Sequence, residues 1–350
     1  MSKVIRLPLP AAAGAALRLE FEVVDGASGA FRFGPQFEHV VDAFHQLLDA
    51  RDGGMPDKHY LAALRKLAER APDFIDLQAH IALYWHDRDQ PKRALDAALG
   101  ALAIANSRIP EGFDGRIEWH CLDNRPYLRA MHVALGAYIR AGRHREAVTL
   151  IELMLARNPD DNQGVRFQLG AELLRSGAAD SALALLQKEA GDYAPNLYEL
   201  ALCYLLREDY VAAATALRRG FAANFYIAEI LGGNPEPAPF AIYHRSCFDD
   251  PVTARDYVRT HGALWQSRAY LSAFVRWLFN QPLVLAERAA LMESQEALAW
   301  ERDPAARATW MEREQRHLAG IDDQLSRSII VRRQYRHGGL IWPWLAMHQN

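Results

Sequence analysis

Helix-pair units recur along the chain at a nearly constant spacing, and this periodicity limits the possible folds more than any other feature. In the clearest unit, residues 131–159, two amphipathic stretches flank Gly142, and Pro159 ends the second because proline cannot continue a helix. Glycine suits the left-handed residue that follows a first helix. Ala147 falls where the second helix presses against the first, and its small side chain lets the two backbones approach.

Three further copies repeat this pattern. Gly177 and Ala182 occupy the turn and small-residue positions one unit later, 35 residues on. Ala213 occupies the small-residue position again after 31 residues, so the connection before it is shortened. Ala94 occupies it in an earlier copy, and the distance to the next copy indicates an insertion at about residues 107–125. Four units exceed the roughly three that a stacked array requires.

The periodicity predicts an all-α fold in which helix pairs stack into a solenoid. We expect the array to cover residues 36–232, including the insertion. Residues 1–35 contain alternating stretches such as LRLEFEVV, which predict a short hairpin or extended cap. Residues 233–350 begin with the break GGNPEPAP and predict irregular C-terminal helices that end in an apolar, tryptophan-rich tail.

The helix pairs resemble tetratricopeptide (TPR) repeats, which implies a right-handed α-solenoid. The stretch over roughly residues 117–175 contains NRPYLRA and NPDDNQGVR. It is similar to a group of bacterial TPR proteins that share NRP(F/Y)xRA followed by NPxDNQGxR. The segment NFYIAEILGGNPEPAP…DDPVTARDYV resembles, more loosely, the C-terminal portion of the suppressor of tumorigenicity seven family. Both resemblances imply protein interaction, and neither implies an enzymatic activity.

The TPR resemblance also implies which residues line the concave face, because first helices line it in such arrays. Seven residues are expected to contact a partner there: Arg129, His132, Ile139, Phe167, Leu174, Tyr198 and Leu202. TPR domains that clamp acidic carboxyl tails carry lysines and asparagines at these positions, and this sequence mostly lacks them. An apolar trough of this kind needs a cover. We expect a partner helix, an extended segment, the chain's own tail LIWPWLAMHQN, or the helices that carry Trp265 and Trp277.

Polar residues at the start of two first helices predict a structural junction that fixes the angle between repeats. Arg166 stands where a TPR packs a large apolar side chain, so we expect it to be buried and paired. Asp160 or Asp161 is expected to cap that helix, and Asn124 to cap the preceding one. The predicted junction consists of Asn124, Arg125, Asp161, Asn162 and Arg166.

A functional alternative is that Arg125 and Arg129 offer forked donors to a carboxylate or phosphate. With His132, the two arginines would make a small-ligand sensor or an enzyme, but no base and nucleophile can be identified. The sequence contains no glycine-rich phosphate loop, no HExxH and no GxSxG. Cys121, Cys203 and Cys247 have neither disulfide nor metal spacing. We therefore expect no enzymatic activity, no cofactor and no metal.

Composition narrows the partner class. The net charge of -3 has the wrong sign for a general nucleic-acid binder. The sequence has no run of about 18 apolar residues, so we expect no membrane span. The stretch MSKVIRLPLP lacks the apolar core of a secretory signal, so we expect a cytoplasmic protein. The composition is typical of bacteria. The sequence favours a scaffold that binds a protein or peptide partner in the concave groove. The alternative is a structural protein that assembles into dimers or open chains through its C-terminal tail.

Overall fold

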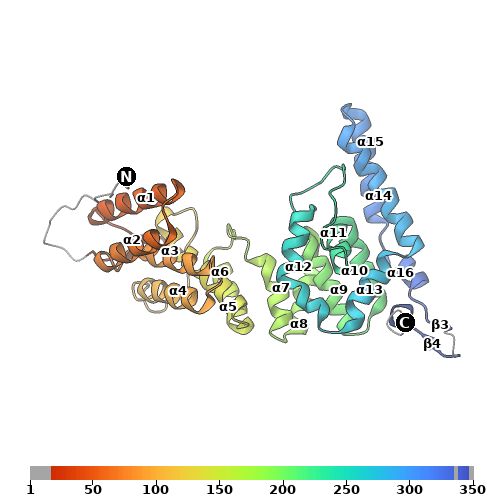
Figure 1. Ribbon diagram of the computed structural model, residues 1–350, viewed down its shortest axis with the longest axis horizontal. Coiled ribbons are helices and arrows are strands. Elements are labelled where there is room, and N and C mark those ends of the chain that lie inside the picture. The colour runs from red at the N-terminus through yellow and green to blue at the C-terminus, as the bar shows by residue number, and fades with distance from the viewer. Residues whose placement is uncertain (1–16, 335–337, 347–350) are drawn as a thin grey trace. The chain divides into compact units, whose positions relative to one another are not determined.

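The computed structural model describes residues 17–334 and 338–346, and they are predominantly helical (Figure 1). These residues form seventeen α-helices and four short strands, which confirms the all-α expectation. Residues 1–16 of the predicted N-terminal cap and residues 347–350 of the predicted tail lie outside the described residues, as do residues 335–337.

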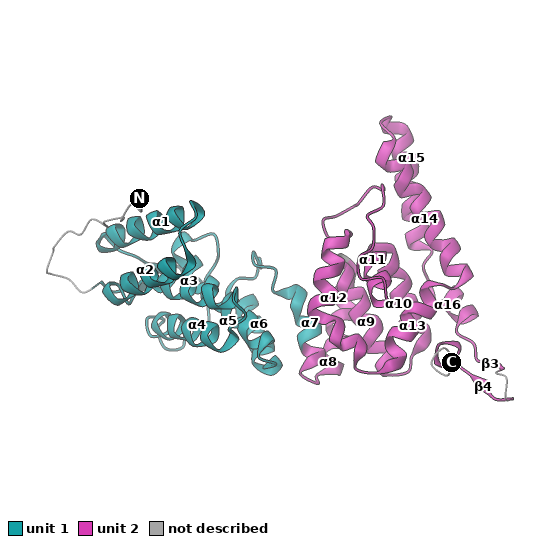
Figure 2. Cartoon of the chain, viewed as in Figure 1, with its two compact units in different colours: residues 1–172 teal, residues 173–350 magenta. Residues whose placement is uncertain are grey.

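The chain forms two compact units, residues 1–172 and residues 173–350 (Figure 2). The boundary falls inside the predicted array of residues 36–232, within helix α7 (Arg166–Arg175). The physical reason lies in the core of unit 2, where side chains before and after residue 233 belong to one hydrophobic cluster: Tyr198, Phe221, Trp265, Phe274 and Trp344. The helices after residue 173 therefore share their core with the C-terminal extension.

Unit 1 opens with an antiparallel hairpin, β1 (Glu20–Val23) and β2 (Gly29–Arg32), at the alternating stretch that predicted it. The 3₁₀ segment η1 (Pro35–Phe37) leads into the helices. Three helices each pack on the next in sequence: α1 (Glu38–Asp52) on α2 (Asp57–Arg70), α3 (Ile75–His86) on α4 (Pro91–Asn106), and α5 (Arg125–Arg140) on α6 (His144–Arg157). Helix α3 also packs on α2 and α5.

Each of four tight turns places a left-handed residue five positions before a fully buried alanine. The predicted glycines have positive φ, +69° at Gly142 and +86° at Gly177. In the other two turns non-glycine residues adopt this conformation, Asp89 at +52° and Glu208 at +61°. The alanines that follow are fully buried, which confirms the predicted small-residue positions: Ala94, Ala147, Ala182 and Ala213. A larger side chain there would force the paired helices apart.

The insertion at residues 107–125 forms a loop that ends in the 3₁₀ segment η2 (Leu122–Asn124). The loop is fixed on one side to the N-terminal hairpin, where Gly29 N donates to Arg116 O at 2.8 Å and Arg116 N donates to Ala27 O at 2.7 Å. On the other side, Ile117 N donates to Arg157 O at the end of α6, at 2.7 Å. The insertion thus connects the hairpin to the third helix pair.

Unit 2 continues with helices α8 (Ala179–Glu189), α9 (Ala194–Leu206), α10 (Tyr210–Ala223) and α11 (Phe225–Leu231). Only the short segment η3 (Ala190–Asp192) and Tyr193 separate α8 from α9, which accounts for the shorter repeat spacing. The C-terminal extension comprises α12 (Pro251–Gln266), α13 (Ala269–Phe279), α14 (Pro282–Trp300), α15 (Pro304–Ala319), α16 (Asp323–Ile329), the strands β3 (Arg333–Gln334) and β4 (Leu340–Ile341), and α17 (Pro343–Ala346).

A buried arginine fastens this extension to α10. Arg218 is 1% exposed, and its Nε donates to Oε1 of Glu287 in α14 at 3.0 Å. Its Nη1 donates to Asp322 O at 2.6 Å and to Ser326 Oγ at 2.9 Å, beside and within α16. A buried guanidinium requires such partners, so Arg218 holds α14 and α16 against α10.

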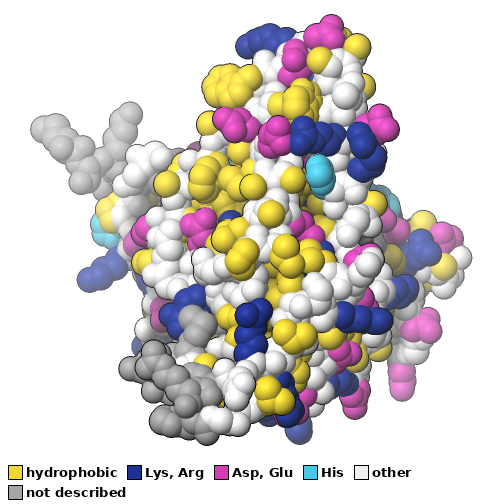
Figure 3. Space-filling view, turned by 90° about the vertical axis from the view of Figure 1, so that its right-hand side faces the viewer, with side chains coloured by type: hydrophobic (Ala, Val, Ile, Leu, Met, Phe, Trp, Pro, Cys, Tyr) yellow, Lys and Arg dark blue, Asp and Glu magenta, His cyan; other side chains and the backbone are white. Residues whose placement is uncertain are grey.

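The surface of the C-terminal helices mixes apolar and charged side chains. Hydrophobic and charged groups are interspersed on the face in Figure 3. Four large apolar side chains of α14 and α15 are exposed: Leu283, Leu285, Trp300 and Met311. Among the described residues, none of the helices combines the length and the apolar character needed to cross a bilayer.

Replacement of Gly177 by valine tests the turn geometry. No atom lies within 4 Å of the Cβ position, so only backbone strain at the left-handed φ opposes valine. We expect Gly177→Val to lower the free energy of unfolding by about 1–2 kcal/mol in urea denaturation followed by circular dichroism. Gly100→Val in α4 is the matched control, because Gly100 has equally open surroundings without the left-handed φ. Equal effects of the two substitutions would contradict the assignment of the turn.

Candidate functional site

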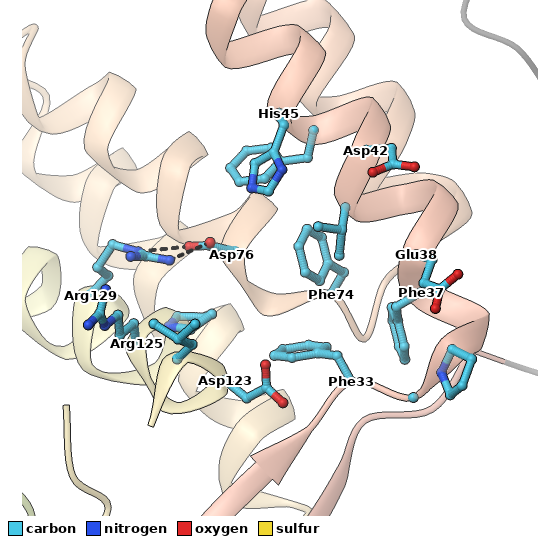
Figure 4. A pocket seen from close by; sticks show the side chains of 16 residues that line it. Phe33, Phe37, Glu38, Asp42, His45, Phe74, Asp76, Asp123, Arg125 and Arg129 are labelled. Atoms are coloured by element: carbon cyan, nitrogen blue, oxygen red, sulfur yellow. Dashed lines mark hydrogen bonds and ion pairs between the residues drawn. The ribbon is translucent and has the colours of Figure 1, made fainter. Parts of the chain in front are cut away.

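A pocket of about 600 Å³ lies in unit 1, between α1, α3 and α5 (Figure 4). These are the first helices of the three pairs. The polar lining comes from one face of α1, from the start of α3, from η2 and from the start of α5: Glu38, Asp42, His45, Asp76, Asp123, Arg125 and Arg129. Figure 4 shows the side chains of α1 and those of α5 on opposite sides of the pocket.

Phenylalanine rings form the apolar part of the lining. Phe33 packs edge-on against Phe37 and Phe74, with ring centroids 5.4 Å and 5.3 Å away. Phe44 packs edge-on against Phe74 at 5.7 Å. Phe37, Phe44 and Phe74 are buried, whereas Phe33 is half-buried and offers the accessible ring. These rings contact one another and form the apolar floor of the pocket.

Asp76 and Arg129 form a bidentate ion pair across α3 and α5. Arg129 Nε donates to Asp76 Oδ1 at 3.0 Å, and Nη2 donates to Oδ2 at 2.5 Å. The Asp76 residue is 6% exposed, so its charge needs this partner. On the same helix His80 Nε2 lies 4.0 Å from Asp76 Oδ1, and its Nδ1 lies 3.2 Å from the Tyr60 hydroxyl. Burial lowers the pKa of His80, and this favours the neutral ring.

The second arginine of the pocket remains available for a ligand. Arg125 Nε donates to the carbonyl oxygen of Trp119 at 3.1 Å, and its guanidinium stacks on the Trp119 ring with its carbon 5.2 Å from the centroid. Its two terminal nitrogens have no hydrogen-bond partner among the described residues. Arg125 and Arg129 therefore do not form the pair of free forks suggested by the sequence, because Asp76 already occupies the fork of Arg129.

His132 lies further along α5 and does not line the pocket. Burial is the main cause of its lowered pKa, and the neighbouring His86 lowers the pKa further, while Asp161 opposes the shift. At Gly136, one turn on, a Cβ atom would lie 2.8 Å from Nε2 of His86, so glycine allows this close approach. Ile139 and Phe167 are both half-buried in unit 1, and neither lines the pocket.

The remaining predicted concave-face residues belong to unit 2. Leu174 is half-buried, but Tyr198 and Leu202 are almost completely buried. The Tyr198 hydroxyl donates to Asn224 O at 2.6 Å, and its ring lies 6.4 Å from that of Trp265 in α12. The C-terminal extension therefore covers these positions. Trp344 of the tail is fully buried in the same hydrophobic cluster as Tyr198 and Leu202. It packs on four rings, those of Tyr210, Phe274, Trp277 and Trp342.

At the predicted junction before α7, the buried charge is a carboxylate and not the expected arginine. Arg166 is not buried, since its side chain is 45% exposed. The buried member is Asp161, whose Oδ1 accepts from Val165 N at 2.8 Å and whose Oδ2 accepts from Arg166 N at 2.9 Å and Arg166 Nε at 3.0 Å. The carboxylate is buried because backbone N–H groups at the helix start solvate it. Asn162 Oδ1 accepts from Asn158 Nδ2 at 3.2 Å.

The sequence predicted that the Asn124 side chain caps α5. This prediction is wrong, because that side chain makes no capping hydrogen bond. It is 1% exposed, and its Oδ1 accepts from Phe31 N at 2.9 Å. Its Nδ2 donates to Gly29 O at 3.2 Å and to Glu118 O at 3.1 Å. Asn124 therefore ties β2 to the start of α5 and holds the chain that leads to Phe33 beside the pocket.

Within the described residues, no group of three or more His, Cys, Asp or Glu side chains is arranged to hold a metal. Cys203 is buried, and burial raises the pKa of its thiol to about 12. His120 is exposed and lies 3.9 Å from Glu118. The raised pKa disfavours the thiolate form of Cys203.

Removal of the Arg129 charge tests the ion pair that forms one wall of the pocket. Arg129→Met keeps the stem and leaves the buried Asp76 carboxylate without its partner, so we expect a loss of about 2 kcal/mol in unfolding free energy. Arg140→Met, on the same helix, is the control, because its partner Asp89 is 86% exposed and we expect a loss below about 1 kcal/mol. Asp76→Asn should restore part of the stability of Arg129→Met, and a strictly additive loss would contradict the pairing.

The comparisons with known proteins assign no family. No protein-family model matches the chain, and the search of curated proteins finds no match. The resemblances drawn from the sequence therefore remain expectations, and the function has to be argued from the chemistry of the pocket.

Proposed function

We propose that this protein is an interaction scaffold built from TPR-like helix pairs, and that unit 1 binds a segment of a partner protein in the pocket between α1, α3 and α5. The observation that carries the proposal is the pocket itself, at about 600 Å³, lined by the first helices of three pairs. One of the seven predicted partner-binding residues, Arg129, lines it.

The walls of the pocket suit a peptide. The phenylalanine floor offers apolar area to a side chain, and the surrounding carboxylates and Arg125 offer charged partners at the edge. The paired Asp76 and Arg129 and the packed phenylalanine rings are already in place, which lowers the ordering cost of binding at that part of the pocket. A smaller groove of about 340 Å³ on α4 and α6 is lined largely by apolar side chains, among them Leu99, Leu102, Leu150 and Leu153. With few charged groups, it is less suited to distinguish one partner sequence from another.

Assembly through the C-terminal tail is the second candidate, and Trp344 is the observation that favours it. Its ring is fully buried against Tyr210, Phe274 and Trp277, so the tail is an apolar plug that fits a defined site. In the structure this plug occupies a site in its own chain. An exchange of tails between two copies would reproduce the same contacts and give a dimer.

Site-specific photo-crosslinking tests the scaffold proposal. A photoreactive amino acid at His45, an exposed residue at the pocket, should yield a defined partner adduct in cells. The control is the same substitution at His59, an exposed histidine of α2 that does not line the pocket, where we expect no such adduct.

The adduct at His45 should also weaken when Phe33→Ala removes the accessible ring of the pocket. The same adduct from both positions, or one that Phe33→Ala leaves unchanged, would contradict partner binding in the pocket. An adduct between two copies of this chain at His45 would favour self-assembly instead.

A further inference from the structure

The charges that line the pocket do not cancel. Four carboxylates and two guanidinium groups lie in the lining. Asp76 and Arg129 neutralise one another through their bidentate pair. Three carboxylates then face the single free guanidinium of Arg125: Glu38, Asp42 and Asp123.

In the part of the chain that the structure describes, none of these three carboxylates forms an ion pair with a cation. Among the described residues, the side-chain carboxylates of Glu38, Asp42 and Asp123 accept no hydrogen bond and form no ion pair. The nearby Arg32 of β2 forms its ion pair with Glu22, at 2.7 Å, and has only a weaker electrostatic interaction with Asp123. Glu38 and Asp42 are one turn apart on α1, so they lie on one face of that helix. The pocket therefore carries a net negative charge that the protein itself does not compensate.

The aromatic floor suits a cation as well. The face of a phenylalanine ring is electron-rich, and it attracts an ammonium or guanidinium group placed over it. Phe33 supplies such a ring at the pocket, while its neighbours Phe37 and Phe74 hold it by edge-on contacts. The same floor can accept the aliphatic stem of a long side chain.

From these observations we infer that the pocket selects a partner segment by a lysine or arginine side chain inserted between the carboxylates and the phenylalanine floor. This inference rests on the proposed function, since it names the chemistry of the segment bound at the same site. The stem packs on the floor, the cationic head interacts with carboxylates of the lining, and Arg125 donates to a backbone carbonyl or carboxylate of the same segment. An anionic segment is disfavoured because one free arginine faces three carboxylates.

Three labelled peptides that differ at one residue test this inference directly. The probes are acetyl-Ala-Leu-Xaa-Leu-Ala-amide with lysine, norleucine or glutamate at the centre, titrated against the full chain by fluorescence anisotropy. Norleucine matches the lysine stem but lacks the ammonium group. We expect the lysine peptide to bind roughly tenfold more tightly than the norleucine peptide, and the glutamate peptide to bind most weakly. The lysine preference should shrink as salt is raised.

A matched pair of double variants locates the effect. Asp42→Asn with Asp123→Asn should abolish the lysine preference. Glu69→Gln with Glu111→Gln removes the same charge from exposed residues of unit 1 that do not line the pocket, and should leave the preference intact. The inference is overturned if norleucine binds as tightly as lysine, if none of the probes binds, or if both double variants lose the preference equally. The scaffold proposal would survive that result if the His45 adduct remains, so the two failures can be told apart.

Discussion

Close approach of two helices at a buried alanine is the constraint on which the rest of the structure depends. In four turns, a residue with positive φ follows the first helix of a pair. Five positions later, the second helix carries an alanine with no exposed surface. The turn fixes where the second helix starts, and the missing side-chain bulk fixes how close it comes. Two of these pairs, α3 with α4 and α5 with α6, belong to unit 1, where side chains of α3 and α5 meet those of α1 in one pocket.

The pocket is polar at its edge because its charges are divided between structural and available groups. The Asp76–Arg129 pair joins α3 to α5, and Asn124 joins the hairpin to the start of α5. These contacts engage both oxygens of Asp76 and both polar atoms of the Asn124 amide, so they position the walls. Arg125 and the carboxylates of α1 and η2 keep their capacity for a ligand. One helix, α5, thus carries both a structural arginine and an available one, a single turn apart.

The turns and helix pairs depend on residues close together in the sequence, so they could be predicted. The contacts of the pocket join residues far apart in the sequence, so they could not. The turn at Gly142 and the buried Ala147 follow from helix geometry, so the repeat spacing was sufficient to predict them. The role of Asn124 was missed because its partner Phe31 is 93 residues away. Arg166 was expected to be buried, but the shorter Asp161 side chain satisfies the helix start from inside. Asp76 shows no local signal that would connect it with Arg129.

The measurement that tests the central claim most directly is amide hydrogen exchange of the full chain, with and without a saturating amount of the lysine-centred peptide. Our account predicts slower exchange around Asp42 in α1 and around Asp123 in η2, with α4 and α6 unchanged. Slower exchange confined to the groove of Leu99 and Leu153, or in the C-terminal helices alone, would contradict it, because the partner segment would then bind outside the pocket.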